Sequence, residues 1–93
     1  MAIGSFRDRR AADLFSGKKV RAFAPIERAA LRKLTMLHAA RTLDDLRSPP
    51  GNRLESLRGN RKGQHSIRIN DRFRLCFVWR DGTAEDVEIV DDH

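Results

Sequence analysis

Apolar and polar residues alternate with a period of two through the C-terminal half of the chain, a pattern typical of half-buried β-strands. The alternation divides into four runs, at residues 53–57, 64–69, 73–79 and 84–90. In the third run, one face of the strand carries Phe73, Leu75, Phe77 and Trp79. Successive side chains of a strand point to opposite faces, so we expect this apolar face in the core.

The apolar positions of the second and third runs also predict how these two strands pair. Ile67 opposite Leu75 brings their apolar faces together, around a three-residue turn at 70–72. This register places Arg68 directly opposite Arg74. Two like charges that face each other across a strand pair are unfavourable by a few tenths to about 1 kcal/mol. We therefore expect a negative group beside these arginines.

The sequence is compatible with two sources for that negative group. The first is internal, because residues 80–82 resemble a three-residue turn with a bulge at its glycine. That turn would pair Leu75 with Val87 and set Glu88 opposite Arg74. The second source is an external anion, such as a phosphate held between the two guanidinium groups. A solvated polar face with one ion pair and an anion-binding face both remain open.

The N-terminal half shows helical periodicity instead. Residues 8–15 predict a short helix, and residues 25–40 predict a longer one. Apolar residues recur in the longer helix at Ile26, Ala30, Leu34 and Leu37. This stripe is expected to cover the apolar face of the sheet, and residues 3–6 are expected to add a short edge strand. The sequence therefore predicts one α+β domain over residues 1–93, with two N-terminal helices packed on one face of a mostly antiparallel four- to five-stranded sheet.

Charge is large and unevenly distributed along the chain. The formal net charge is +6. Residues 53–80 hold eight Arg or Lys against only Glu55 and Asp71, whereas residues 81–93 hold six carboxylates and no Lys or Arg. A basic block of this kind favours a polyanionic partner, either nucleic acid or an acidic protein. Composition does not choose between the two.

Several chemistries find no support in the residues. The three histidines and the single cysteine, Cys76, are not spaced as metal ligands, and no glycine-rich phosphate loop precedes a helix, so we expect no metal and no cofactor. A single cysteine excludes an internal disulfide and suits the reducing cytoplasm. The chain has no apolar run of membrane-spanning length and no signal-peptide pattern at its start, so we expect a cytoplasmic protein without membrane contact.

What remains for chemistry is the polar face of the sheet and the loop that enters it. These regions carry Arg58, Arg61, Lys62, Arg68 and Arg74. Guanidinium groups bind phosphates bidentately and can stabilise the charge of a pentavalent phosphorane. A histidine or carboxylate near the end of the chain could move protons, and RNA supplies its own nucleophile in the 2′-hydroxyl. The residues are therefore compatible with phosphodiester cleavage in RNA.

Specific segments of the chain add a resemblance to a known family. They are the opening SFRDR, then PPGNRLE, LRGNR-G, SIRIND, R-CF-W and the closing VEIVD-H. Together they resemble the HigB toxins of the RelE/ParE superfamily, the killer halves of bacterial type II toxin–antitoxin modules. The resemblance implies a toxin that cuts mRNA on the translating ribosome. It also implies a HigA-like helix-turn-helix antitoxin as partner, and contact with operator DNA only through the complex with that antitoxin.

The same resemblance assigns roles to individual residues. Arg58 takes the place of a basic residue in a Leu-Lys/Arg-Gly motif, and Arg74 matches a strand arginine of the family. Asp91, Asp92 and His93 occupy the positions of a closing Asp-Tyr-His, and these five residues are the expected catalytic set. Arg61 matches a basic residue in the loop before the sheet. Together with Lys62 of that loop and Arg68 of the polar face, it forms the expected RNA- and phosphate-binding set.

Two positions depart from the family pattern. Asp92 replaces a tyrosine and cannot stack on a base, and Glu55 replaces a histidine found in some relatives. Asp92 is expected to weaken cleavage, whereas Glu55 could still act as a base, and both changes bear on the rate and the codon preference of cleavage. Two other functions therefore remain open: a ParE-like inhibitor of DNA gyrase, and a non-enzymatic binding partner of the antitoxin.

Overall fold

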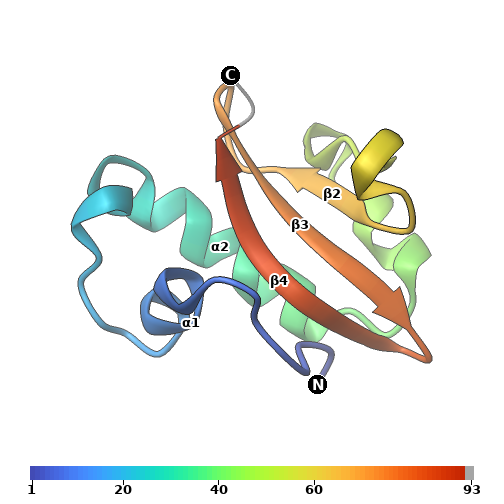
Figure 1. Ribbon diagram of the computed structural model, residues 1–93, viewed down its shortest axis with the longest axis horizontal. Helices are drawn as coiled ribbons and strands as arrows, with labels where there is room; N and C mark the ends of the chain where they lie inside the picture. The colour runs from blue at the N-terminus through green and yellow to red at the C-terminus, as the bar shows by residue number, and fades with distance from the viewer. Residues whose placement is uncertain (92–93) are drawn as a thin grey trace.

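Four strands form one antiparallel sheet in the order β1–β2–β3–β4. Figure 1 shows the neighbouring strands β2, β3 and β4. The computed structural model describes residues 1–91. The strands are β1 (Glu55–Ser56), β2 (His65–Arg68), β3 (Phe73–Arg80) and β4 (Thr83–Asp91), and the helices are α1 (Arg9–Phe15) and α2 (Glu27–Ala39). The α+β class, the two helices and the four antiparallel strands are confirmed.

Short 3-10 helices fill most of the connections. They are η1 (Arg21–Ile26), η2 (Leu43–Arg47), η3 (Pro50–Asn52) and η4 (Gly59–Arg61). Pro25 lies inside η1, so the α-helix expected over residues 25–40 begins only at Glu27. The expected edge strand at residues 3–6 forms two isolated parallel bridges to β4, Ile3 with Ala84 and Phe6 with Val87, and is not counted as a strand.

The core lies between the helices and the inner face of the sheet. Leu14 of α1 and Leu34 of α2 are buried in the same cluster as Leu75 and Phe77 of β3. The apolar stripe of α2 thus covers the face of β3 that the sequence predicts for it. The opposite face of the sheet is left for the polar and charged residues. No helix within residues 1–91 combines the length and apolar character needed to cross a membrane.

Pairing between β2 and β3 follows the predicted register. Ile67 lies opposite Leu75, and Arg68 lies opposite Arg74. In the turn at 70–72, the Asn70 side-chain oxygen accepts hydrogen bonds from the backbone N–H groups of residues 72 and 73, at 2.9 and 2.8 Å. An asparagine side chain that mimics the backbone in this way stabilises a tight turn.

The register between β3 and β4 is shifted by two positions from the predicted register. One position of this shift arises in the turn. Arg80 pairs with Thr83, which leaves a two-residue turn of Asp81 and Gly82 in place of the predicted three-residue turn. Both turn residues have positive φ, +51° and +77°. Turns of this type match the right-handed twist of the two strands, and Asp-Gly is a favoured sequence for them.

The other position of the shift comes from a β-bulge. Val78 pairs with Glu85 and Cys76 with Glu88, so Phe77 alone faces the two residues Asp86 and Val87. The bulged Asp86 has φ +53°. A bulge reverses the alternation of faces along its strand, and Val87 stays buried as a result.

The corrected register changes the partner of Arg74. Leu75 pairs with Ile89, Arg74 with Val90, and Glu88 with Cys76. The prediction that Glu88 lies opposite Arg74 is therefore wrong.

The first strand is shorter than predicted. The alternation predicts a strand over residues 53–57, but only Glu55 and Ser56 pair with β2. Arg53 has left-handed backbone angles, φ 46° and ψ 58°, at the end of η3, which are incompatible with a strand. This conformation directs the Arg53 carbonyl oxygen toward β3, where it accepts a hydrogen bond from Arg74.

Replacing Gly82 by alanine is expected to destabilise the protein by about 1–2 kcal/mol, since a Cβ is unfavourable in the left-handed region. Gly51→Ala is a matched control, because Gly51 has no positive φ and no atom lies within 4 Å of the place that a Cβ would take there. Urea unfolding of both variants measures the difference. Equal stabilities of the two variants would contradict the assigned turn.

Candidate functional site

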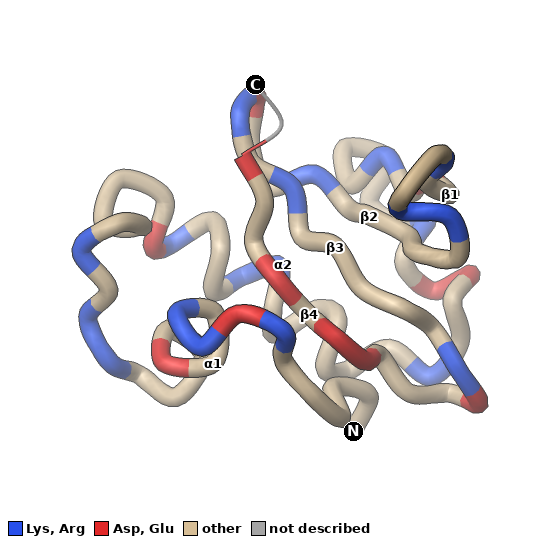
Figure 2. The backbone as a smooth tube through the Cα atoms, viewed as in Figure 1, with Lys and Arg blue, Asp and Glu red and all other residues tan. Residues whose placement is uncertain are grey.

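The basic residues predicted as a site gather on the sheet face opposite the core and on the segment between β1 and β2. We call this set the basic face. It consists of Arg58, Arg61, Lys62, Arg68 and Arg74. Figure 2 shows basic residues along the β1–β2 segment and at the start of β3, and acidic residues along β4. The segment lies over the polar face, because Arg61 reaches Glu88 of β4 at 2.7 Å.

Arg74 is held by two neutral oxygens from other parts of the fold. Its Nε donates a hydrogen bond to the Ser66 Oγ at 2.8 Å, and its Nη2 donates one to the Arg53 carbonyl oxygen at 2.8 Å. Its Nη2 also lies 3.3 Å from the Glu55 carboxylate. The Arg74 side chain is 12% exposed and that of Glu55 is 58% exposed. The guanidinium is therefore fixed in orientation, with a carboxylate on its solvent side.

Arg68 and Arg74 lie opposite each other, yet each has its own partners. Arg68 donates from Nε to the Asn70 carbonyl oxygen at 3.2 Å and forms an ion pair with Asp71. Arg74 likewise forms an ion pair with Glu55. Both like charges are thus offset within the chain, by carboxylates other than the predicted Glu88.

Glu88 instead binds Arg61. The Arg61 Nη1 donates to the Glu88 carboxylate at 2.7 Å and to the Gln64 side-chain oxygen at 3.0 Å. The hydrogen bond that Arg61 donates to Glu88 raises the pKa of Arg61 above its ordinary value, against the opposing effect of burial. Arg61 therefore fastens the η4 segment to the sheet, and its charge is already neutralised there.

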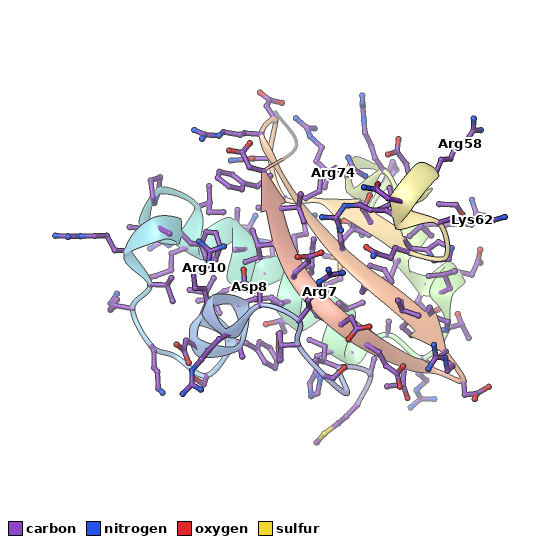
Figure 3. The ribbon with its side chains drawn as sticks, in the orientation of Figure 1. Arg7, Asp8, Arg10, Arg58, Lys62 and Arg74 are labelled. Atoms are coloured by element: carbon purple, nitrogen blue, oxygen red, sulfur yellow. The ribbon has the colours of Figure 1, made fainter. Side chains whose placement is uncertain are left out.

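Arg58 and Lys62 flank η4 and are exposed. Within residues 1–91, neither side chain makes a hydrogen bond or an ion pair. Figure 3 shows both side chains pointing outward from the β1–β2 segment, while Arg74 lies against the sheet. These two cations are available to a polyanion without the loss of an internal contact.

The carboxylate at the end of β4 is also engaged. Arg72 donates from Nε and Nη2 to Asp91 Oδ2 at 2.9 and 2.8 Å, and this hydrogen bonding raises the pKa of Arg72. The pair ties the end of β4 to the turn between β2 and β3. The predicted catalytic residues Asp92 and His93 lie outside the described residues.

Sequence reasoning missed the groups that hold Arg74. The alternation places Ser66 on the polar face, but nothing in it indicates that Ser66 accepts a hydrogen bond from this arginine. The pairing of β1 with β2 would have indicated these neighbours. Glu55 pairs with Ser66, and side chains of paired residues share one face of the sheet, here the polar face that carries Arg74. The Arg53 carbonyl has no such signal, since its direction depends on a left-handed backbone.

A separate hollow of about 300 Å³ lies beside η2 and β1. Its lining residues are Leu43, Asp44, Arg47, Leu54, Ser56 and His65. The His65 Nδ1 is buried and has no hydrogen-bond partner within residues 1–91. His65 pairs with Phe77 and so shares the core face of the sheet, away from the basic face. Residues 1–91 contain no group of three His, Cys, Asp or Glu side chains arranged to hold a metal ion.

Comparison with known proteins places the chain in a family. The model of a family described as the RelE-like toxin of the type II toxin–antitoxin system HigB matches residues 4–93. Toxin HigB-1 of Vibrio cholerae is 58% identical over 59 residues, which are 63% of this chain and 62% of that protein. An uncharacterized protein of Haemophilus influenzae is 37% identical over 62 residues, 67% of this chain and 60% of that protein.

Both alignments span less than two thirds of the relative's own length. The family match, by contrast, covers nearly all of this chain and includes every residue of the basic face. The chain therefore belongs to the HigB-like family of RelE-like toxins of type II toxin–antitoxin systems.

Proposed function

We propose that this toxin is a ribosome-dependent endoribonuclease that cuts mRNA in the cytoplasm and stops translation. The observation that supports it most is the anchored guanidinium of Arg74, on the sheet face away from the helices. A guanidinium that is fixed before substrate arrives can stabilise transition-state charge without reorganising. Family membership adds an antitoxin as partner, and we propose a HigA-like helix-turn-helix protein.

In the proposed mechanism, Arg74 holds the scissile phosphate, and Arg58 supplies a second charge from the η4 segment. The adjacent 2′-hydroxyl attacks the phosphorus, and the guanidinium groups stabilise the extra negative charge of the pentavalent phosphorane. The bond from phosphorus to the 5′-oxygen then breaks, which leaves a 2′,3′-cyclic phosphate on one fragment and a 5′-hydroxyl on the other. His93 is proposed to transfer protons. Asp91 is hydrogen-bonded to Arg72, so we propose that it positions the end of β4 and leaves proton transfer to His93.

Two carboxylates near the proposed site already have partners, which supports a role for the ribosome. Glu55 lies 3.3 Å from Arg74 and Glu88 lies 2.7 Å from Arg61, so each is engaged with an arginine of the same chain. With few groups to move protons, much of the acceleration must come from orientation of the message, which the ribosome can supply.

Induction of the toxin without its antitoxin tests the proposal. We expect protein synthesis to stop before DNA supercoiling changes, and new 5′ ends to appear in mRNA that is bound to ribosomes. Purified RNA without ribosomes is expected to remain intact. Loss of supercoiling with intact mRNA would instead support gyrase inhibition, and would contradict the proposal.

The paired arginines favour one other candidate, a binding partner of the antitoxin without nuclease activity. Arg61, Arg68 and Arg74 each already face a carboxylate of the same chain. That candidate predicts a stable complex with the antitoxin, normal growth on induction and no new mRNA ends. The same induction experiment therefore separates the two functions.

A further inference from the structure

We propose that Glu55 occupies the position of an RNA phosphate on Arg74, so that RNA binds by replacing this internal carboxylate. The inference rests on the proposed function, because it names the residue that competes with the substrate at the same site. Carboxylate and phosphate oxygens bind the same edges of a guanidinium group. Glu55 would then set how tightly the toxin holds RNA.

The hydrogen bonds of Arg74 leave donors for a phosphate. Nε and one N–H of Nη2 are used by Ser66 and by the Arg53 carbonyl oxygen. A guanidinium has five N–H donors, so the two N–H groups of Nη1 and the second N–H of Nη2 remain. Glu55 Oε1 lies 3.3 Å from Nη2, next to a nitrogen that still has a donor.

The two sides of this site differ in how firmly they are held. Ser66 is completely buried in β2, so the acceptor for Nε cannot easily move. Glu55 lies in a strand of only two residues at the edge of the sheet, and its side chain is 58% exposed. The carboxylate can therefore swing into solvent while Arg74 stays in place.

Repulsion between the phosphate and the Glu55 carboxylate requires that one replace the other at Arg74. A phosphate that approaches Arg74 while Glu55 remains there would bring two negative charges within a few ångströms of each other, which is unfavourable. By comparison, Glu88 is only 16% exposed and lies 2.7 Å from Arg61, so that pair is less easily opened. Exposed ion pairs change an equilibrium by a factor of about one to five. Binding energy from the rest of the message can compensate for a factor of this size.

The test measures binding of an RNA that cannot be cut. The probe is a fluorescein-labelled single-stranded oligonucleotide with 2′-O-methyl groups, and fluorescence anisotropy gives its Kd for the full chain. We expect Glu55→Gln to lower Kd by about two- to five-fold. Glu85→Gln is the matched control, because it makes the same change of charge at a carboxylate that lies 3.0 Å from Arg80. We expect it to change Kd by less.

A second comparison localises the effect to Arg74. In an Arg74→Ala background, Glu55→Gln is expected to lose its advantage over Glu85→Gln, because the shared partner is gone. Equal Kd values for Glu55→Gln and Glu85→Gln, weaker or no binding by Glu55→Gln, or an advantage that survives in the Arg74→Ala background would each overturn the inference.

Failure of this inference and failure of the proposed function have different signatures. The anisotropy measurement does not depend on cleavage, so its result stands whether or not the toxin cuts mRNA. Conversely, absence of new mRNA ends on induction would contradict the proposed nuclease alone.

Discussion

Replacing Arg74 by alanine is expected to slow mRNA cleavage by about a hundred- to a thousand-fold, or about 3 to 4 kcal/mol at the transition state. The reason is that Arg74 is fixed by Ser66 and the Arg53 carbonyl before any substrate arrives. A loss of this size is expected to make expression of the toxin harmless. The measurements are the rate at which cleaved ends appear in a reconstituted translation reaction and the growth of cells after induction.

Two further variants show whether the effect is specific. Arg80→Ala removes the same charge at the far end of β3, where the side chain is 66% exposed, and is expected to retain activity. Arg74→Lys keeps the charge but loses the planar fork, so we expect its cleavage to stay well below that of the natural chain. An Arg74→Ala protein that is soluble and folded, yet stops growth at full strength, would remove Arg74 from the mechanism.

Replacing Phe77 by alanine is expected to lower the free energy of unfolding by about 3–5 kcal/mol. Phe77 is completely buried, and its ring packs against His65 and Trp79 with centroid distances of 6.2 and 6.5 Å. Its removal leaves a cavity at the point where β4 is bulged. Because domains of this size are often stable by only about 5–15 kcal/mol, much of the protein's stability is expected to be lost.

Urea unfolding followed by the fluorescence of Trp79, the single tryptophan, measures this loss. Phe77→Leu keeps most of the volume and is expected to cost less. Phe77→Ala is thus expected to reduce toxicity by lowering the population of folded protein, whereas Arg74→Ala is expected to abolish toxicity without unfolding the protein. A loss below about 1 kcal/mol for Phe77→Ala would show that the core does not depend on this ring.

Much of the fold follows from periodicity alone. The alternation that places Leu75 and Phe77 on one face of β3 is a local property, and burial of that face requires only that a helix cover it. The pairing of Ile67 with Leu75 follows similarly, because a slip of one residue would expose a whole apolar face. Both predictions are confirmed because they depend only on which face of each strand is apolar, and the apolar face of a sheet is the one that is buried.

The candidate site was predictable in its residue types and much less so in its contacts. The arginines of the basic face stand out by charge, and the position of Arg68 opposite Arg74 is confirmed. Their partners do not follow from the sequence, because hydrogen-bond geometry depends on exact strand register. The predicted pairing of Glu88 with Arg74 failed on a shift of two residues, and Glu88 binds Arg61 instead.

The sequence by itself determined the α+β class, the buried faces of the strands and helices, the pairing of β2 with β3 and the concentration of basic residues before β4. Tertiary structure alone decided the bulge at Asp86 and the left-handed Arg53 that supplies an oxygen to Arg74. The physical reason is that side-chain patterning specifies which residues are buried, whereas positive φ angles are selected by strand twist and by contacts between distant segments.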